Sequence, residues 1–272
     1  MILEYLDIIV WPLMATFVLT GIHVYLGLHV VTRGVIFVDL ALAQVAALGM
    51  AVGVLLGLEH EAGAMYFLAL GFTFLGALLF SYTRSVNESA PQEAIIGITY
   101  VVSAAAMILL FSKSPEGAEH LNHLLVGSIL FVTPKEILQT FALYAAIGAF
   151  HWRFRTQFLE ASKEEGGGGP SSSRRLWDFL FYITFGFVVT SSVKIAGVLL
   201  VFSFLIIPAV AALLFVDNIS SRLTFGWTFG VAGSILGILL SLLLDVPTGA
   251  AIVVTFGLML AVAWIVRPKR SS

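Results

Sequence analysis

The sequence predicts an all-α, polytopic membrane protein with eight or nine transmembrane helices. Of its 272 residues, 59% are hydrophobic and 11% are charged, and the mean hydropathy is +1.02. Such a balance is typical of chains embedded in a bilayer rather than of soluble domains. About 20 apolar residues span a bilayer core. Stretches of that kind lie near 8–30, 35–57, 62–83, 92–112, 136–151, 177–193, 195–216, 224–244 and 247–266. The fifth and sixth stretches are the shortest, which leaves the count at eight or nine.

The basic residues predict the orientation of these spans. Lys and Arg concentrate in cytoplasmic loops. With nine spans and a cytoplasmic C-terminus, the inner loops and the C-terminal tail hold 11 of the 14 basic residues. These are Arg33, Arg84, Arg153, Arg155, Lys163, Arg174, Arg175, Arg222, Arg267, Lys269 and Arg270. The opposite orientation would reverse the ratio, so we expect the C-terminus in the cytoplasm.

Composition narrows the chemistry and the domain organisation. The absence of Cys excludes disulfides and thiolate metal ligands. The net charge of −2, with no basic stripe outside the membrane-flanking loops, gives no indication of a nucleic-acid partner. Residues 160–175 contain four consecutive glycines and three consecutive serines, which is typical of a flexible linker. We therefore expect one transmembrane domain over residues 1–272, with a flexible cytoplasmic linker at 160–175.

Ionisable and polar residues inside the first two stretches are the candidate functional residues. Asp39 is the only acidic residue between Asp7 and Glu59, and His23, His29 and Gln44 lie in the same two stretches. A charge inside a membrane-length apolar segment costs about 2.5–3.5 kcal/mol on insertion scales, so such residues usually serve a function. His and Gln alone often only hydrogen-bond neighbouring helices. The carboxylate together with imidazoles favours a divalent-metal pathway.

The spacing of these residues around the turn Thr32-Arg33-Gly34 suggests two layers. In a tight helical hairpin, residues equally far from the turn lie at equal depth. His29 then pairs with Asp39, and His23 pairs with Gln44. At about 1.5 Å rise per residue, the two layers are about 7–9 Å apart. Nitrogen and carboxylate ligands suit zinc, manganese or ferrous iron, so we expect a metal site at Asp39 and His29, with His23 and Gln44 as a second layer.

Five stretches of the chain carry recognisable motifs. Residues 196–209 and 244–250, which read Ala-Gly-Val-Leu-Leu-Val-Phe-Ser-Phe-Leu-Ile-Ile-Pro-Ala and Leu-Asp-Val-Pro-Thr-Gly-Ala, are the most specific, and 33–44, 93–97 and 125–130 are weaker. Together they resemble the permease subunit of the ABC-3 family of zinc, manganese and iron ABC importers. With the pattern of spans between them, the likeness covers residues 12–266. It implies the fold of a type II ABC importer permease in the bacterial cytoplasmic (inner) membrane.

One of these stretches departs from the family pattern. The family usually has Gly-Asp-Ala-x-Ser-His, whereas this chain has Val38, Leu42 and Ala43 at the Gly, Ser and His positions and retains Asp39. The usual Asp and His lie four residues apart, on one face of a helix. We expect His29, from the preceding helix, to supply the missing imidazole.

The resemblance also implies partners and a mechanism. Two permeases form a homodimer around a central pathway, two cytoplasmic ATPase subunits hydrolyse ATP, and an outer binding protein delivers the metal. The metal is cargo, and no permanently bound cofactor is implied. This chain is not the ATPase, because its glycine run 166–169 is followed by Pro170 and lacks the Lys-Ser/Thr pair of a phosphate-binding loop. By likeness to the corrinoid importer permease, residues 207–222 dock on the ATPase. We expect Pro208 to break or kink the helix there and Asp217-Asn218 to provide the N-cap of the next helix.

The leading hypothesis is therefore an importer permease for a divalent transition metal, with zinc first and manganese or iron as alternatives. A permease for a chelated metal or corrinoid is a second hypothesis, and it predicts a pathway without metal ligands. An intramembrane hydrolase is a third. His60-Glu61 is not followed by the second His of a metalloprotease helix, and nothing marks a nucleophile.

Overall fold

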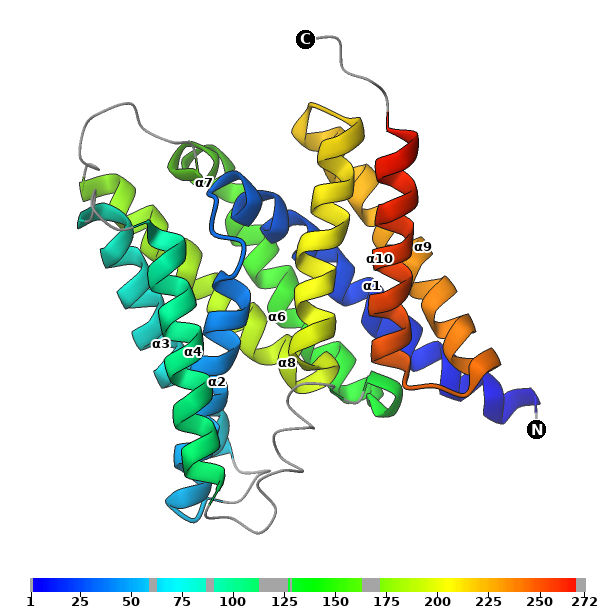
Figure 1. Cartoon of the computed structure of the whole chain (residues 1–272), viewed down its shortest axis with the longest axis horizontal. Coiled ribbons are helices and arrows are strands. Elements are labelled where there is room, and N and C mark those ends of the chain that lie inside the picture. Colours follow the sequence, from blue (N-terminus) through cyan, green and yellow to red (C-terminus); the bar gives the residue numbers. More distant parts are fainter. Residues whose placement is uncertain are drawn as a thin grey trace. The chain divides into compact units, whose positions relative to one another are not determined.

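All regular structure in the part of the chain that the computed structural model describes is helical. The described residues are 2–58, 63–86, 91–112, 127, 129–162 and 172–267. Figure 1 shows the helices, and their bounds are as follows. They are α1 (Ile2–Thr32), α2 (Val38–Leu55), α3 (Gly63–Val86), α4 (Gln92–Phe111), the 3₁₀ turn η1 (Ile129–Phe131), α6 (Pro134–Arg153), α7 (Arg155–Ser162), α8 (Ser172–Phe215), α9 (Ile219–Leu244) and α10 (Thr248–Val266).

The all-helical fold confirms the predicted class. Within the described ranges, seven helices are long and apolar enough to cross a membrane, namely α1, α2, α3, α4, α8, α9 and α10. Helix α8 covers two of the predicted spans, and its backbone leaves helical geometry at Gly197, where φ is 74° and ψ is 162°. Helix α6, predicted as the fifth span, forms over 20 residues but is not among the seven.

Two sequence-based boundaries shift in the structure. Helix α2 begins at Val38 rather than at residue 35, because Gly34 has a positive φ of 67° and the Val38 N–H donates to the Val35 carbonyl to close a turn. The ends of the predicted linker are helical, since residues 160–162 belong to α7 and 172–175 belong to α8. The rest of that linker, 163–171, lies outside the described residues.

The chain divides into two compact units. Unit 1 comprises Met1–Val31, Leu125–Ala145 and Ile195–Ser272, and unit 2 comprises Thr32–Leu124 and Ala146–Lys194. In unit 2, α2 packs against both α3 and α4. Small residues of α2, Ala47 and Ala51, contact Met107 and Phe111 of α4 in a buried apolar cluster. Apolar packing between α2 and α4 therefore holds the helix that carries Asp39 and Gln44. A single domain over residues 1–272 stays a prediction.

In unit 1, glycines let α9 approach its neighbours closely. A Cβ at Gly226 or Gly230 would press on side chains of α1, and one at Gly233 or Gly237 would press on α10. Small residues at such positions allow the van der Waals contact that holds membrane helices together. The turn from α9 to α10 is fixed by Asp245, the only described residue other than glycine with positive φ, at 53°.

Two stretches of the family resemblance meet in unit 1. Gly127 has φ of 65°, and a Cβ on it would overlap backbone atoms of Ala196 and Gly197. These are the residues at which α8 departs from helical geometry. Glycine is needed at position 127 both for its backbone conformation and for this close approach.

Two expectations were made for residues 207–222, the segment predicted to dock on an ATPase: an N-cap for the next helix, and a break or kink at Pro208. The Asn218 side chain accepts a hydrogen bond of 3.0 Å from the Ser221 N–H and caps α9, which confirms the predicted cap. Helix α8 runs through Pro208 to Phe215 and only Gly197 has non-helical dihedral angles, so the proline does not break the helix, and a kink there stays a prediction. Neighbouring groups compensate for proline in many membrane helices.

Candidate functional site

Asp39 lies in the first turn of α2 and is almost completely buried, with 1% of its surface exposed. Neither carboxylate oxygen has a hydrogen-bond partner among the described residues. The start of a helix favours a negative charge by a few tenths of a kcal/mol to about 1 kcal/mol. Burying an unpaired carboxylate costs several kcal/mol. The helix end therefore offsets only part of the cost, and the arrangement suits a carboxylate that receives a cation.

His23 and His29 lie on α1, and both are buried. Nδ1 of His23 is 2.7 Å from the carbonyl oxygen of Leu19, so it carries the hydrogen and donates it. In that tautomer Nε2 has the lone pair that metal binding requires. His23 also packs edge-on against Tyr144 of α6, and His29 packs edge-on against Tyr25 with ring centres 4.7 Å apart.

Gln44 is buried on α2, and its side-chain oxygen has no hydrogen-bond partner among the residues that the structure describes. The histidines belong to unit 1, whereas Asp39 and Gln44 belong to unit 2. The predicted pairing in two layers across the turn therefore stays a prediction. Over the described ranges, no group of three His, Asp or Glu side chains is close enough to hold a metal.

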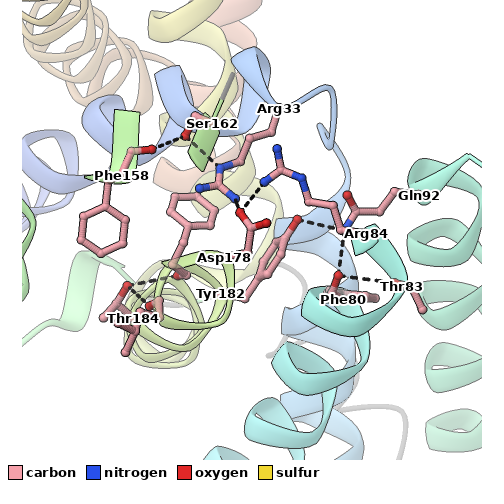
Figure 2. Close-up of polar contacts among 12 residues, drawn as sticks. Arg33, Phe80, Thr83, Arg84, Gln92, Phe158, Ser162, Asp178, Tyr182 and Thr184 are labelled. Carbon is pink, nitrogen blue, oxygen red and sulfur yellow. Dashed lines mark hydrogen bonds and ion pairs between the residues drawn. The ribbon is translucent and has the colours of Figure 1, made fainter. Parts of the chain in front are cut away.

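A cluster of charged residues that the sequence analysis did not predict lies in unit 2. Nη1 of Arg33, in the turn before α2, donates to Oδ1 of Asp178 on α8 at 2.6 Å. Nη1 of Arg84, near the end of α3, donates to the same oxygen at 2.5 Å. Figure 2 shows both guanidinium groups directed at this carboxylate. We call these three residues the Asp178 cluster; it links the α1–α2 turn, α3 and α8.

Contacts around the Asp178 cluster fix the orientation of Arg33. Its Nε donates to Oγ of Ser162 at 3.0 Å, and its guanidinium lies 4.0 Å from the ring centre of Phe181. Burial lowers the pKa of Arg33, and the charge of Arg84 lowers it further, while Tyr182 and Asp178 raise it. The cluster has two positive charges and one negative charge, so Asp178 is fully neutralised.

Arg33 and Arg84 were counted only as basic residues of the inner loops, but both also pair with Asp178. The side chain of Arg33 is wholly buried and that of Arg84 is 14% exposed. A signal for Asp178 was present in the sequence, because it is the only charged residue in the predicted span 177–193. Asp39 was identified as a charged residue inside a membrane-length apolar segment, and Asp178 is another such residue. Its partners lie 145 and 94 residues away, and nothing in the sequence indicates those pairings.

Comparison with known proteins identifies the family. The family model of the ABC 3 transport family matches residues 5–267. The chain is similar to the manganese import system permease protein ScaB of Streptococcus parasanguinis, with 23% identity over 245 residues that cover 90% of this chain and 85% of that protein. It is also similar to a probable iron transport system membrane protein of Haemophilus influenzae, with 24% identity over 89% of this chain and 87% of that protein.

Solved structures support the same assignment. PsaBC from Streptococcus pneumoniae, solved in complex with a Fab, matches with a TM-score of 0.78 and 25% identity, over 99% of this chain and 98% of that chain. An inward-facing putative metal-chelate type ABC transporter matches with a TM-score of 0.66 over 93% of this chain and 84% of that chain. Its identity is 17%, so this second likeness shows the fold alone.

These matches decide between the classes of protein that the sequence left open. They extend over nearly the whole chain, and the family model describes a transport family, which excludes the intramembrane hydrolase. This multi-pass membrane protein belongs to the ABC 3 transport family and is a permease subunit of an ABC transporter, not its ATPase.

Proposed function

We propose that this chain is the permease of an ATP-driven importer of divalent transition metal, with Asp39 as the charged ligand of the pathway. The observation that carries the proposal is the buried carboxylate of Asp39, whose oxygens have no hydrogen-bond partner among the described residues. A buried anion of this kind is stabilised when a cation enters. A permease for an intact chelate or corrinoid has no need of such a ligand.

Manganese(II) and iron(II) are the first candidates for the cargo. The names of similar proteins refer to manganese and iron transport. Zinc, which the sequence analysis ranked first, suits the same nitrogen and oxygen ligands. We include zinc as a competitor in the experiment, so that the order of the three metals is measured.

In the proposed mechanism, each ligand binds the metal transiently. The metal reaches Asp39 after losing part of its hydration shell, and His29 offers a nitrogen at the same depth. His23 and Gln44 then form a second layer one to two helical turns away. The metal is released when the pathway changes shape. ATP hydrolysis on a cytoplasmic subunit, which docks near 207–222, drives that change.

Two further partners complete the proposed importer. An outer binding protein delivers the metal to the permease, and a second copy of this chain encloses the pathway. The C-terminus faces the cytoplasm, as the distribution of Lys and Arg indicates.

The test is uptake of manganese, iron and zinc by cells that lack their own importers and express the whole system. Asp39→Asn keeps the size of the side chain and removes its charge, so we expect loss of most uptake with unchanged expression. His29→Ala should lose a comparable share, and His23→Ala and Gln44→Ala should lose less. Glu160→Gln, which removes an exposed carboxylate on α7, is the matched control. Uptake at the wild-type rate by Asp39→Asn would reject the role of this residue.

A further inference from the structure

The segment between α1 and α2 is short and is anchored at both of its ends. Residues 33–37 connect the helices, and Asp39 follows two residues later. At the first end, Arg33 is bonded to Asp178 and Ser162. At the second end, the Phe37 N–H donates to Oε1 of Glu93 on α4 at 3.2 Å.

Inside the segment, further contacts leave little freedom. Val35 and Val38 are buried, and the Val38 N–H donates to the Val35 carbonyl at 3.1 Å. The Ala41 N–H then donates to the Phe37 carbonyl and begins the regular helix. The position of the Asp39 carboxylate therefore depends on where the anchors hold this segment.

We propose that Arg33 is a positioning residue for the metal pathway and that Asp178, by holding Arg33, sets where Asp39 meets the cation. The inference rests on the proposed function of Asp39. It adds Arg33 and Asp178, which lie outside the predicted metal ligands, as determinants of metal affinity. A metal ligand is effective only when the groups behind it hold it in place, and loss of such a group costs about 10–100-fold in affinity.

The chemistry of arginine explains why this residue suits the role. The planar guanidinium of Arg33 donates to Asp178 through Nη1 and to Ser162 through Nε. Because these partners belong to different helices, they fix both the position and the rotation of the guanidinium. The Phe181 ring lies against the guanidinium at 4.0 Å. A lysine offers one point of charge and would leave the segment free to rotate about it.

Arg84 supplies a matched control within the same cluster. It donates to the same oxygen of Asp178 but belongs to α3 and not to the segment that leads to Asp39. Replacing either arginine by glutamine removes one guanidinium and leaves one arginine paired with Asp178. Both variants therefore keep a balanced ion pair, and only one of them releases the α1–α2 segment.

The experiment measures binding of Mn²⁺ to the permease–ATPase complex in lipid nanodiscs, by the loss of the electron paramagnetic resonance signal of free Mn²⁺. We expect Arg33→Gln to weaken binding about tenfold and Arg84→Gln to stay within about twofold of the wild type. Arg33→Lys should fall between the two. The thermal midpoint of each metal-free complex is measured alongside, and we expect both glutamine variants to lower it similarly.

Three outcomes separate the possibilities. Equal loss of affinity in Arg33→Gln and Arg84→Gln would make the cluster purely structural and overturn the inference. Wild-type binding by Arg33→Gln, while Asp39→Asn loses binding, would overturn the inference and leave the proposed function intact. Wild-type binding by Asp39→Asn would instead reject the metal site itself. If Arg33→Gln does not fold, Arg33→Lys decides, and wild-type affinity in that variant would refute the positioning role.

Discussion

Gly127→Ala tests whether the contact between two family stretches holds unit 1 together. The added methyl group would meet the backbone of Ala196 and Gly197 at the point where α8 leaves helical geometry. Backbone atoms cannot rotate away as a flexible side chain can. The change therefore combines an unfavourable backbone conformation, since φ is 65°, with overpacking.

The size of the effect follows from these two contributions. An alanine forced into positive φ costs about 1 kcal/mol, and overpacking of a closely packed site costs about 1–3 kcal/mol more. Gly127→Ala should thus destabilise the protein by about 2–4 kcal/mol. Gly57 is the matched control, because its φ is 76° and a Cβ there meets no atom within 4 Å. Gly57→Ala should cost only the first contribution, about 1 kcal/mol.

The assay is the fraction of purified protein that remains monodisperse in detergent after heating to a series of temperatures. For a chain of this size, 1 kcal/mol shifts the midpoint by about 2–4 °C. We expect a loss of about 3 °C for Gly57→Ala and about 6–12 °C for Gly127→Ala. Equal midpoints for the two variants would show that the close approach at Gly127 contributes nothing, and the reasoning from backbone contact would be refuted.

Two further predictions concern orientation and the metal ligands. A cysteine introduced by Gly168→Cys, in a chain without native cysteines, should react with an impermeant thiol reagent only after the cells are permeabilised; labelling in intact cells would reverse the orientation. Ala43→His introduces an imidazole four residues after Asp39, on the same face of α2, where the family resemblance implies one. It should recover part of the metal uptake lost in His29→Ala, and no recovery would mean that the two imidazoles do not serve one site.

Apolar length predicted most of the spans. Helix α6, predicted as the fifth span, is not among the seven candidate spans of the described residues. The predicted boundaries agree with the helices to within a few residues, apart from the starts of α1, α8 and α9, which lie earlier in the chain than predicted. Helix α8 continues through Pro208 where a break or a kink was expected, because membrane helices tolerate proline better than isolated helices do. The start of α2 was placed three residues early, because the turn closed by Val35 and Val38 depends on the backbone of Gly34.

The candidate site was predicted less completely than the spans. Burial of Asp39 follows from its place in an apolar segment, and the structure agrees. The Asp178 cluster joins residues from three distant segments, and a rule based on equal distance from one turn detects only pairs across that turn. The anchoring of Phe37 by Glu93 was missed for the same reason, since α4 follows α2 only after a further helix.

Asp39 and Asp178, the two buried carboxylates among the described residues of unit 2, have opposite surroundings, and the contrast bears on function. Asp178 has two guanidinium partners, whereas Asp39 has no hydrogen-bond partner among the described residues. Arg33 lies only six residues before Asp39, and yet its charge is directed to Asp178. A carboxylate with a resident counter-ion gains little from a passing cation, because the cation must first displace it. By holding Arg33, Asp178 leaves the negative charge of Asp39 without a fixed partner, which is the condition that a transported divalent cation requires.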